Sequence, residues 1–380
     1  MRLLNAIILS KSPRRNDLIL GIRLVHPSSA SGQHLQARSY TNEENYSMQN
    51  SERFIKPTIP LGTWSWGNKL LYSYDKKTDD ASILQTYSKA RSMGCNIFDT
   101  GDSYGTGSLE GNAEMLLKKC EDNYASNSPG GARDKPIFIA KIAPYPWLLT
   151  GESYYQKIKS SHEKLIVDPT SESPVFVPSL HWSPSNYLPF QTRSLYSGLL
   201  KAYETGLCTS VGFSNIGPNA LLEATEYFSK KNIPIACNQI QCNLLSDYEN
   251  DVERVVDLAK ELGVTSLGYS PLGLGLLTGE RKTRGNLRNN LFKSIESDGS
   301  YKDLKNTLKD IAEDKGASVE NIAISWVRGK GLIPLVGCRD VKMAEGNFRE
   351  VEIGEEEMER IDEVRRKCEK KGTRNVFMTG

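Results

Sequence analysis

The chain has 380 residues, of which 38% are apolar and 25% charged, and its 48 basic and 46 acidic residues leave a net charge of +2. This apolar content can form a core, which excludes a wholly disordered chain, and the balanced charge excludes a general nucleic-acid binder. No apolar run approaches the ~18 residues of a membrane-spanning helix, and the cysteines and histidines are not closely spaced, so we expect neither a membrane span nor a zinc site.

The first 52 residues differ in composition from the rest of the chain. Residues 1–40 contain six basic residues, six serines and one acidic residue, with an apolar stripe of four Leu and Ile residues within 3–8. This composition is typical of an organelle transit peptide; residues 38–41 resemble a mitochondrial processing site, and plastid signals overlap in composition. We therefore expect residues 1–52 to be disordered and to direct a soluble protein to a plastid or mitochondrion. The alternative is a tail without targeting function on a cytoplasmic protein.

Residues 53–380 alternate short apolar runs with stretches of helical periodicity. The expected strands are residues 59–66, 96–100, 136–142, 175–182, 209–214, 235–241, 266–270 and 332–337. The expected helices are residues 81–93, 112–120, 154–165, 194–205, 218–230, 250–262, 302–316, 318–328 and 355–369. Between them, residues 125–135 and 283–300 are expected to form long loops, and the second loop could cover a site.

Strands that alternate with helices pair in parallel through crossover helices. Eight such units predict an α/β fold of one domain, a (β/α)8 TIM barrel over residues 53–380. A doubly wound sheet is the structural rival, but the turn after its first strand is usually glycine-rich, and residues 66–69 have no GxGxxG pattern. The seven cysteines are expected to be reduced, and most of them to be small core residues.

Polar side chains gather at the carboxyl ends of three expected strands, which is the end of this barrel where active sites lie. Asp99 ends the second strand and Tyr104 follows it, Lys141 lies in the third strand, and His181 ends the fourth. Such a set suits carbonyl reduction, in which Tyr104 would donate the proton. Lys141 would lower the pKa of Tyr104, Asp99 would keep Lys141 charged, and His181 would polarise the substrate oxygen.

Each of these residues also has a structural interpretation when it is considered alone. Asp99 could cap a turn, Tyr104 could be a half-buried aromatic residue, and His181 could be a hydrogen-bonded core histidine. Lys141 is harder to explain in this way, because lysine is rarely buried without a partner.

Two motifs resemble functional signatures of other protein classes but do not meet their requirements. The Asp-Thr-Gly of residues 99–101 has no second copy to form an aspartic protease pair. The glycines of residues 273–279 do not have the spacing of a dinucleotide fingerprint, although they could bind a phosphate.

Seven stretches, in this order, resemble the aldo-keto reductase superfamily over essentially all of residues 53–380. They are FDTGDSYGTG (98–107), AKI (140–142), LHW (180–182), VGFSN (211–215), NQIQCNLL (238–245), YSPLGLGLLTG (269–279) and IPLVGCRDVKMAEGNF (333–348). The opening LGTWSWGNK (61–69) is similar to a plastid-type subgroup. The resemblance implies an oxidoreductase on a (β/α)8 barrel that uses NADPH, with NADH less favoured and no metal.

The resemblance also implies roles for individual residues. Asp99, Tyr104, Lys141 and His181 match the catalytic tetrad of the family, with Tyr104 as the proton donor. The matches to the cofactor site are Ser214, Asn215 and Gln239 for the carboxamide, Tyr269 for stacking under the nicotinamide, Ser270, Leu272 and Gly275 for the pyrophosphate, and Asn347 near the adenine. Residues 337–347 match the segment around the 2′-phosphate.

Three segments depart from the family pattern. Met343 stands where many members have an arginine that binds the 2′-phosphate, and Arg339 and Lys342 could substitute for it. Residues 168–173 lack the usual lead-in to the fourth strand, and residues 109–112 look like an insertion.

Aromatic residues follow the first, third and fourth expected strands. Trp66, Tyr145, Trp147 and Trp182 would form an aromatic wall suited to a flat or apolar aldehyde, unless they are ordinary packing under long loops. Trp326 lies in an expected helix and is expected in the core.

The sequence therefore predicts an organellar NADPH-dependent reductase that converts aldehydes or ketones to alcohols. Reactive carbonyls and pyridoxal are the expected small-molecule substrates, and we expect a monomer or weak oligomer that binds neither nucleic acid nor membrane. The rival hypothesis is a slow, NADP-binding regulatory or redox-sensing subunit of the same fold. A barrel without a cofactor would leave Lys141 and His181 unexplained.

Overall fold

The computed structural model describes residues 58–105, 112–127, 134–166, 173–185, 188–278 and 295–368, without the side chains of residues 70, 71 and 251. The expected targeting segment, the domain boundary near residue 52, the departures at residues 109–111 and 168–172, and most of the loop expected at 283–300 lie outside these residues.

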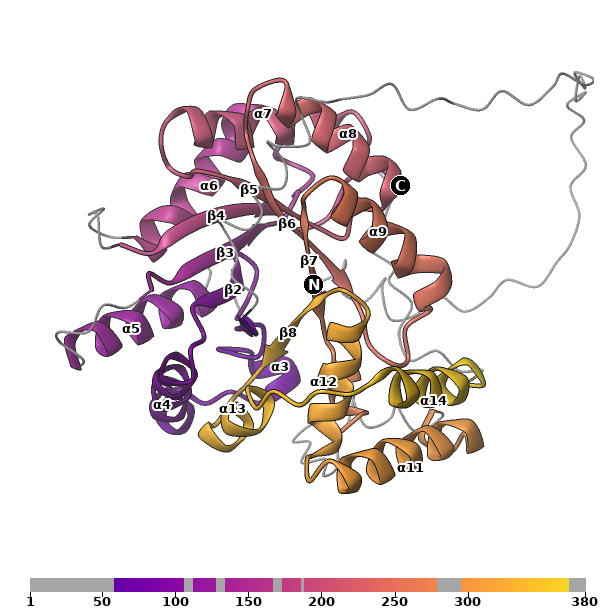
Figure 1. The fold of residues 1–380 in the computed structure, drawn as a ribbon. Helices are drawn as coiled ribbons and strands as arrows, with labels where there is room; N and C mark the ends of the chain where they lie inside the picture. The colour runs from indigo at the N-terminus through magenta and orange to yellow at the C-terminus, as the bar shows by residue number, and fades with distance from the viewer. Residues whose placement is uncertain are drawn as a thin grey trace, which may run out of the picture. The chain divides into compact units, whose positions relative to one another are not determined.

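Eight parallel strands form a closed barrel in chain order, with β1 paired to β8 (Figure 1). The strands are β1 (Leu61–Gly62), β2 (Ile97–Gly101), β3 (Ile137–Ile142), β4 (Val175–Leu180), β5 (Val211–Ser214), β6 (Ile235–Gln241), β7 (Thr265–Tyr269) and β8 (Ile333–Gly337). The predicted (β/α)8 barrel is thus confirmed.

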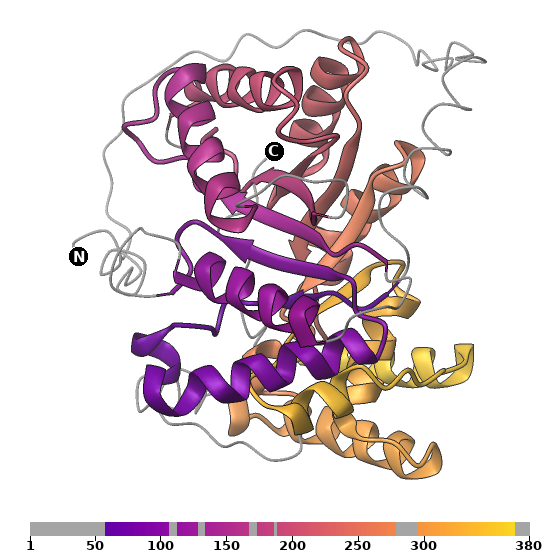
Figure 2. The ribbon, with the colours of Figure 1, turned by 90° about the vertical axis from the view of Figure 1, so that its left-hand side faces the viewer.

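Helices surround the strands, as a view turned by 90° shows (Figure 2). They are α3 (Lys69–Tyr72), α4 (Lys76–Ser92), α5 (Asn112–Asn127), α6 (Gly151–Leu165), α7 (Gln191–Glu204), α8 (Pro218–Ser229), α9 (Glu253–Glu261), α11 (Gly299–Asp314), α12 (Val319–Gly329), α13 (Val341–Asn347) and α14 (Glu355–Arg366). A π-helical turn, η1 (Tyr248–Val252), precedes α9, and a short 3-10 turn, η2 (Gly273–Gly275), follows β7.

Some element boundaries differ from the sequence prediction for local reasons. The first strand was expected to extend to residue 66, but a tight turn in which the Trp66 N–H donates to the Thr63 carbonyl ends it at Gly62. The loop expected from residue 125 begins later, because α5 continues to Asn127. The loop expected up to residue 300 ends earlier, because the Asp298 side chain accepts from the Ser300 N–H and starts α11.

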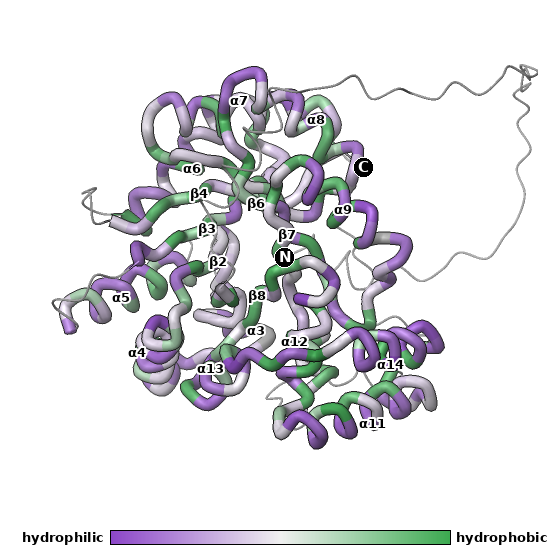
Figure 3. The backbone as a smooth tube through the Cα atoms, viewed as in Figure 1, coloured by the Kyte–Doolittle hydropathy of each residue, from purple (hydrophilic) through white to green (hydrophobic). Residues whose placement is uncertain are grey.

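Successive side chains of each strand point to opposite faces of the sheet, so the strands contribute to an inner and an outer part of the core. Side chains such as Ile97, Ile139 and Leu267 point inward and form an apolar cluster inside the barrel. Side chains at the alternate positions of the strands, such as Phe98 and Phe213, point outward and pack against the helices in a larger cluster. Hydrophobic colouring accordingly follows the strands, while the helices alternate hydrophobic and hydrophilic segments (Figure 3).

The inward-facing side chains change from apolar to polar towards the carboxyl ends of the strands. Two residues beyond Ile97, Ile139 and Cys237, the same faces carry Asp99, Lys141 and Gln239. A strand has a side-chain period of two, so these polar groups lie directly above the apolar cluster. The polar site therefore has an apolar floor.

The cysteines and Trp326 lie in the core, as expected. All seven cysteines are buried and free, and Trp326 is fully buried with its indole N–H donating to Asp362 at 2.9 Å. Among the described residues there is no group of three or more potential metal ligands. None of the helices described here is long and apolar enough to cross a membrane.

A buried carboxylate pair lies between the loop after β2 and helices α5 and α6. Glu114 is fully buried, accepts a hydrogen bond from Ser161, and has Lys164 at 3.6 Å. Burial raises the pKa of Glu114 to about 7, and burial also raises the pKa of the nearby Asp102 to about 6. Folding therefore shifts both acids towards the protonated form relative to the unfolded chain.

Replacing Glu114 by Gln is expected to stabilise the protein at alkaline pH. The pKa of Glu114 is about 7 in the folded protein against an ordinary 4.5, so the free energy of unfolding falls as pH rises between these values, by roughly 3 kcal/mol. Glutamine keeps an acceptor for Ser161 and cannot ionise. Urea unfolding from about pH 5 to about pH 8 should show a flatter profile for Glu114→Gln. Glu226→Gln, at an exposed ion pair with Lys230, is the control, and parallel profiles for all three proteins would contradict the prediction.

Candidate active site

A buried ion pair forms the centre of the site. The Lys141 ammonium donates to both Asp99 oxygens, at 2.8 and 2.6 Å, and the two side chains are 4% and 2% exposed. Asp99 raises the pKa of Lys141 against the effect of burial, and burial raises the pKa of Asp99 against the effect of Lys141. Each charge is present because the other compensates for its desolvation.

Gln239 joins this pair from β6, which sequence analysis did not anticipate. Its Nε2 donates to Asp99 Oδ1 at 2.7 Å, and its Oε1 accepts from Lys141 Nζ at 3.1 Å. The side chain was expected at the carboxamide of a cofactor, but both ends of its amide contact the ion pair. No local signal in the sequence indicates this contact, because β6 is not adjacent to β2 or β3 in the sheet.

Tyr104 lies in the turn that follows β2, with its N–H donating to the Gly101 carbonyl. A Cβ atom at Gly101 would lie 3.4 Å from the Tyr104 ring and 3.3 Å from the Lys141 carbonyl oxygen, so glycine permits this close approach. The Lys141 ammonium lies 4.9 Å from the centre of the Tyr104 ring.

Two opposing effects set the pKa of the Tyr104 hydroxyl. Burial raises its pKa to about 12, and the neighbouring Lys141 opposes this rise without cancelling it. Lys141 lowers the pKa of Tyr104, as expected, but the desolvation of the phenolate outweighs this charge, so the pKa stays above its usual value. The hydroxyl is protonated at neutral pH.

His181 follows β4 and faces Tyr104 edge to face, with 5.7 Å between the ring centres. Burial and the Lys141 charge hold its pKa well below the usual value, so the imidazole is neutral. Its Nδ1 is buried without a hydrogen-bond partner in the protein. The structure thus brings together all four residues that the sequence singled out, as a neutral histidine and a neutral tyrosine beside a buried ion pair.

Asn215 and Tyr269 connect the ends of neighbouring strands next to this cluster. Asn215 has a left-handed backbone, with φ of 58°, and its Nδ2 donates to the His181 carbonyl at 3.1 Å. Its Oδ1 accepts from the Tyr269 hydroxyl at 2.9 Å. Ser214 lies beside it, with its hydroxyl donating to the Gln239 carbonyl. Ser214, Asn215 and Tyr269 therefore form a second polar group at the same end of the barrel.

The loop after β7 has an unusual backbone. Ser270 and Leu274 have φ of 54° and 57°, and Gly273 and Gly275 are also left-handed. A left-handed leucine is rare, because its Cβ approaches the backbone closely. Successive turns of this kind form concavities lined by N–H groups that bind anions, and Leu272 lies at the start of this turn. The strain, which the sequence did not reveal, is concentrated in the segment expected to bind a pyrophosphate.

The segment after β8 carries both signs of charge. Asp340 accepts from the Met343 N–H at 2.8 Å and starts α13. The Arg339 guanidinium lies 5.2 Å from the centre of the Tyr72 ring, and Lys342 follows in the first turn of the helix. Asn347 is buried at the end of α13, with its Nδ2 near the Gly337 carbonyl oxygen.

The three tryptophans expected in a pocket have different environments. Trp66 is fully buried and its indole N–H donates to the Cys338 carbonyl at 2.9 Å, so it is a core residue and the expectation of a pocket role was wrong. Trp147 is 62% exposed and stacks on Tyr145, with 4.8 Å between ring centres and 9° between planes. Trp182 is half-buried, 4.8 Å from the His181 ring.

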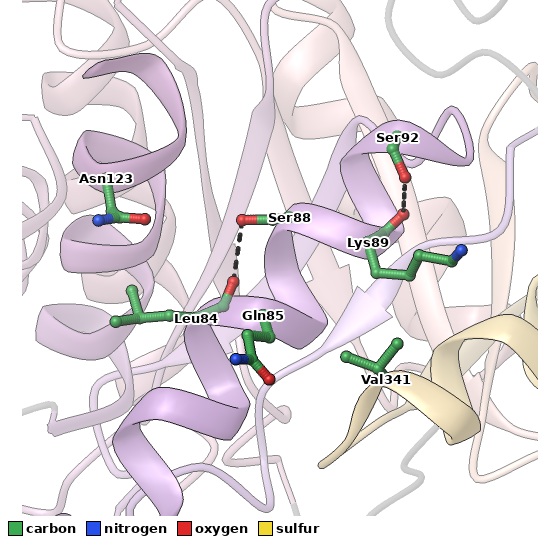
Figure 4. A pocket seen from close by; sticks show the side chains of 7 residues that line it. All are labelled: Leu84, Gln85, Ser88, Lys89, Ser92, Asn123 and Val341. Atoms are coloured by element: carbon green, nitrogen blue, oxygen red, sulfur yellow. Dashed lines mark hydrogen bonds between the residues drawn. The ribbon is translucent and has the colours of Figure 1, made fainter. Parts of the chain in front are cut away.

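An open groove of about 450 Å³ lies elsewhere, on the outside of the barrel between α4, α5 and α13 (Figure 4). It is lined by residues that include Gln85, Asn123 and Val341. The hydroxyls of Ser88 and Ser92 bond to carbonyls of α4 itself, at Leu84 and Lys89. None of these residues belongs to the polar cluster at the strand ends.

Comparisons with known proteins identify the family of the chain. The family model described as "Aldo/keto reductase family" matches residues 58–366. Pyridoxal reductase, chloroplastic, of Arabidopsis thaliana is 34% identical over 326 residues, covering 84% of this chain and 86% of the relative.

Two solved structures share the fold. A Bombyx mori aldo-keto reductase in complex with NADP has a TM-score of 0.57 and 18% identity, covering 81% of this chain and 89% of that chain. The glycerol dehydrogenase of Gluconobacter oxydans has a TM-score of 0.63 and 21% identity, covering 84% of this chain and 95% of that chain.

Proposed function

The chain belongs to the aldo/keto reductase family, and from this premise we propose that it reduces the carbonyl group of small aldehydes or ketones to an alcohol with NADPH. The observation that carries the proposal is the buried Asp99–Lys141 pair beside a protonated Tyr104 and a neutral His181. A buried ion pair is weak evidence for stability, and perturbed groups that converge at one end of a barrel are characteristic of active sites.

The residues at this end of the barrel fit a nicotinamide cofactor. His181 Nδ1 is an unpartnered buried polar atom, the loop after β7 has the left-handed backbone typical of anion-binding turns, and Arg339 and Lys342 add positive charge after β8. The residues that would hold the cofactor are Ser214, Asn215, Tyr269, Ser270, Leu272, Gly275, Arg339 and Asn347. When bound, NADPH supplies a hydride to the carbonyl carbon.

The side chains of the protein handle the proton and the developing negative charge. His181 is neutral and donates a hydrogen bond that polarises the substrate oxygen. Tyr104 gives its hydroxyl proton to the same oxygen, and Lys141 stabilises the phenolate that remains. Asp99 keeps Lys141 protonated and oriented. The high pKa of Tyr104 keeps the proton available at neutral pH, so the charge of Lys141 acts mainly as the phenolate forms.

Pyridoxal is the substrate that we infer within this class. The support is the relative of that name, together with the Tyr145–Trp147 stack, which presents a flat aromatic face near the carboxyl ends of the strands. Gln191 fixes this loop by donating to the carbonyls of Tyr145 and Leu148, both at 2.8 Å. A fixed aromatic face suits an aromatic aldehyde better than a short aliphatic one.

Replacing Trp147 by Ala is expected to raise the KM for pyridoxal and 4-nitrobenzaldehyde about two- to tenfold, the loss that one aromatic contact predicts. The kcat should change little, and the KM for methylglyoxal, which has no ring, should not change. Because Trp147 is largely exposed, the melting temperature should also be retained. Leu222→Ala, at an exposed apolar residue of α8, is the control. An equal rise in KM for all three aldehydes would contradict an aromatic role for Trp147.

The experiment that tests the function uses the purified full-length chain with NADPH and NADH in turn. Cofactor oxidation is followed with 4-nitrobenzaldehyde, methylglyoxal and pyridoxal. Turnover with NADPH and pyridoxal is expected. Tight NADPH binding without turnover of any aldehyde would favour the rival function, a slow regulatory or redox-sensing subunit.

A plastid location is a further part of the proposal. It is supported by the composition of residues 1–52 and by the chloroplastic relative. A fluorescent protein fused behind residues 1–52 should accumulate in plastids. Accumulation in mitochondria, or a diffuse cytoplasmic signal, would contradict this location.

A further inference from the structure

Asp102 is a buried carboxylate directly after β2 that the proposed mechanism does not use. It is 1% exposed and precedes Tyr104 by two residues. Its backbone N–H donates to the Lys141 carbonyl at 3.0 Å, and its Oδ1 accepts from the Ala143 N–H at 3.3 Å. The side chain therefore continues the pairing between β2 and β3 beyond the point where the backbone turns away towards Tyr104.

The charge of Asp102 lies beside the ring of Tyr145. The ammonium of Lys157, in α6, is 3.6 Å from Asp102 Oδ2 and 5.8 Å from the centre of the Tyr145 ring. Burial and the Asp102 charge raise the pKa of the Tyr145 hydroxyl, so the carboxylate and the phenol are neighbours. Asp102 thus binds the segment after β3 at Ala143 and lies close to it again at Tyr145.

The same segment is fixed further along the chain by Gln191, whose amide donates to the carbonyls of Tyr145 and Leu148, both at 2.8 Å. Trp147 lies between these two residues and stacks on Tyr145, with 9° between the ring planes. The stacked rings of Tyr145 and Trp147 form the aromatic face. Two buried polar side chains from different elements, Asp102 and Gln191, therefore hold the backbone that carries the aromatic face.

We propose that Asp102 is a positioning residue that fixes the aromatic face relative to the hydroxyl of Tyr104 and thereby favours aldehydes that carry a flat ring. This inference rests on the proposed function, because it concerns the choice of substrate at the same site. The physical reason is preorganisation: the segment is held before the substrate binds, so a ring that meets the aromatic face does not have to order it. An aldehyde without a ring gains nothing from this order.

The test compares Asp102→Leu and Asp102→Asn in the full-length chain. Leucine fills a similar volume without an acceptor, and Asp102→Ala replaces it if the leucine variant does not fold. Asparagine keeps an oxygen that can accept from the Ala143 N–H. The measured quantity is kcat/KM for 4-nitrobenzaldehyde divided by kcat/KM for methylglyoxal, which is called the ring preference below.

The ring preference should fall about two- to tenfold in Asp102→Leu, the effect of one hydrogen bond, and by less than about twofold in Asp102→Asn. Burial and, to a smaller extent, Asp102 raise the pKa of Tyr104. A change in that pKa acts on both aldehydes alike, so the ring preference cancels it. A merely structural role of Asp102 would likewise lower both rates together.

A second background shows whether Asp102 acts through the aromatic face. In Trp147→Ala part of the face is already missing, so adding Asp102→Leu should leave the ring preference unchanged. The matched control is Glu114→Gln, at a second buried acid of the same region, which accepts from Ser161 and lies near Lys164, both in α6. This control should keep the ring preference of the wild type.

Four results would overturn the inference: an unchanged ring preference in Asp102→Leu, an equal fall in Asp102→Asn, the same fall in the Trp147→Ala background, or the same fall in Glu114→Gln. If the wild type reduces no aldehyde, the proposed function fails, and the inference is tested by hydrogen exchange instead. The Ala143 and Tyr145 amides, which donate to Asp102 and to the Ala143 carbonyl, should exchange faster in Asp102→Leu and not in Glu114→Gln. Exchange at the wild-type rate in Asp102→Leu would then overturn the inference.

Discussion

The Tyr104→Phe variant is expected to lose carbonyl reduction by a factor of about 10²–10⁴ while binding NADPH as the wild type does. Phenylalanine removes the hydroxyl that gives the proton to the substrate oxygen. The ring remains, so its contacts with the Lys141 ammonium and with the edge of His181 can persist. The site therefore keeps its shape and its charges and loses one proton donor.

Single-turnover reduction of 4-nitrobenzaldehyde and fluorescence titration with NADPH measure these two effects separately. Tyr248→Phe, which removes a hydroxyl that donates to the Lys330 carbonyl outside the site, is the matched control and should retain the activity. A rate within about tenfold of the wild type would mean that another group supplies the proton.

The Lys141→Met variant is expected to lose about 3–5 kcal/mol of stability in addition to its activity. It leaves the Asp99 carboxylate buried without a counter-charge, which is the costly way to break a buried ion pair. Burial already raises the pKa of Asp99, and without Lys141 that pKa rises further. A folded-state pKa above the unfolded value favours folding at low pH, so the free energy of unfolding of the variant should fall as pH rises through the pKa of Asp99.

The double variant Asp99→Asn, Lys141→Met tests whether the loss of stability comes from the unpaired Asp99 charge or from the loss of the Lys141 side chain. It removes both charges and leaves an amide that can still accept from Gln239 Nε2. We expect it to be more stable than Lys141→Met, to show no such pH dependence, and to remain inactive. Urea unfolding of the wild type, Asp99→Asn, Lys141→Met and the double variant at two pH values gives the coupling free energy of the pair. If the two single effects simply add in the double variant, the pair is not coupled as the structure indicates.

The wrong and missed assignments at the site have two physical causes. One is long-range contact: no local pattern shows that the Gln239 side chain from β6 meets Asp99 and Lys141 inside a closed barrel. The other is burial. Trp66 was expected at the pocket but lies fully buried against Cys338, which is far away in the chain. Lys141 lowers the pKa of Tyr104, as the sequence indicated, but the larger effect of burial raises it, and the sequence does not show the extent of that burial.

The sequence by itself determined the order of strands and helices, the barrel, and the four residues Asp99, Tyr104, Lys141 and His181. It could do so because strand and helix periodicity is local, and because a lysine inside an apolar strand requires a partner. The tertiary structure alone decided how these residues are arranged. Closure of the barrel placed them above an apolar floor, and exclusion of water set their protonation states. The same closure brought Gln239 to the ion pair, since contacts between distant strands depend on the whole fold and not on any one segment.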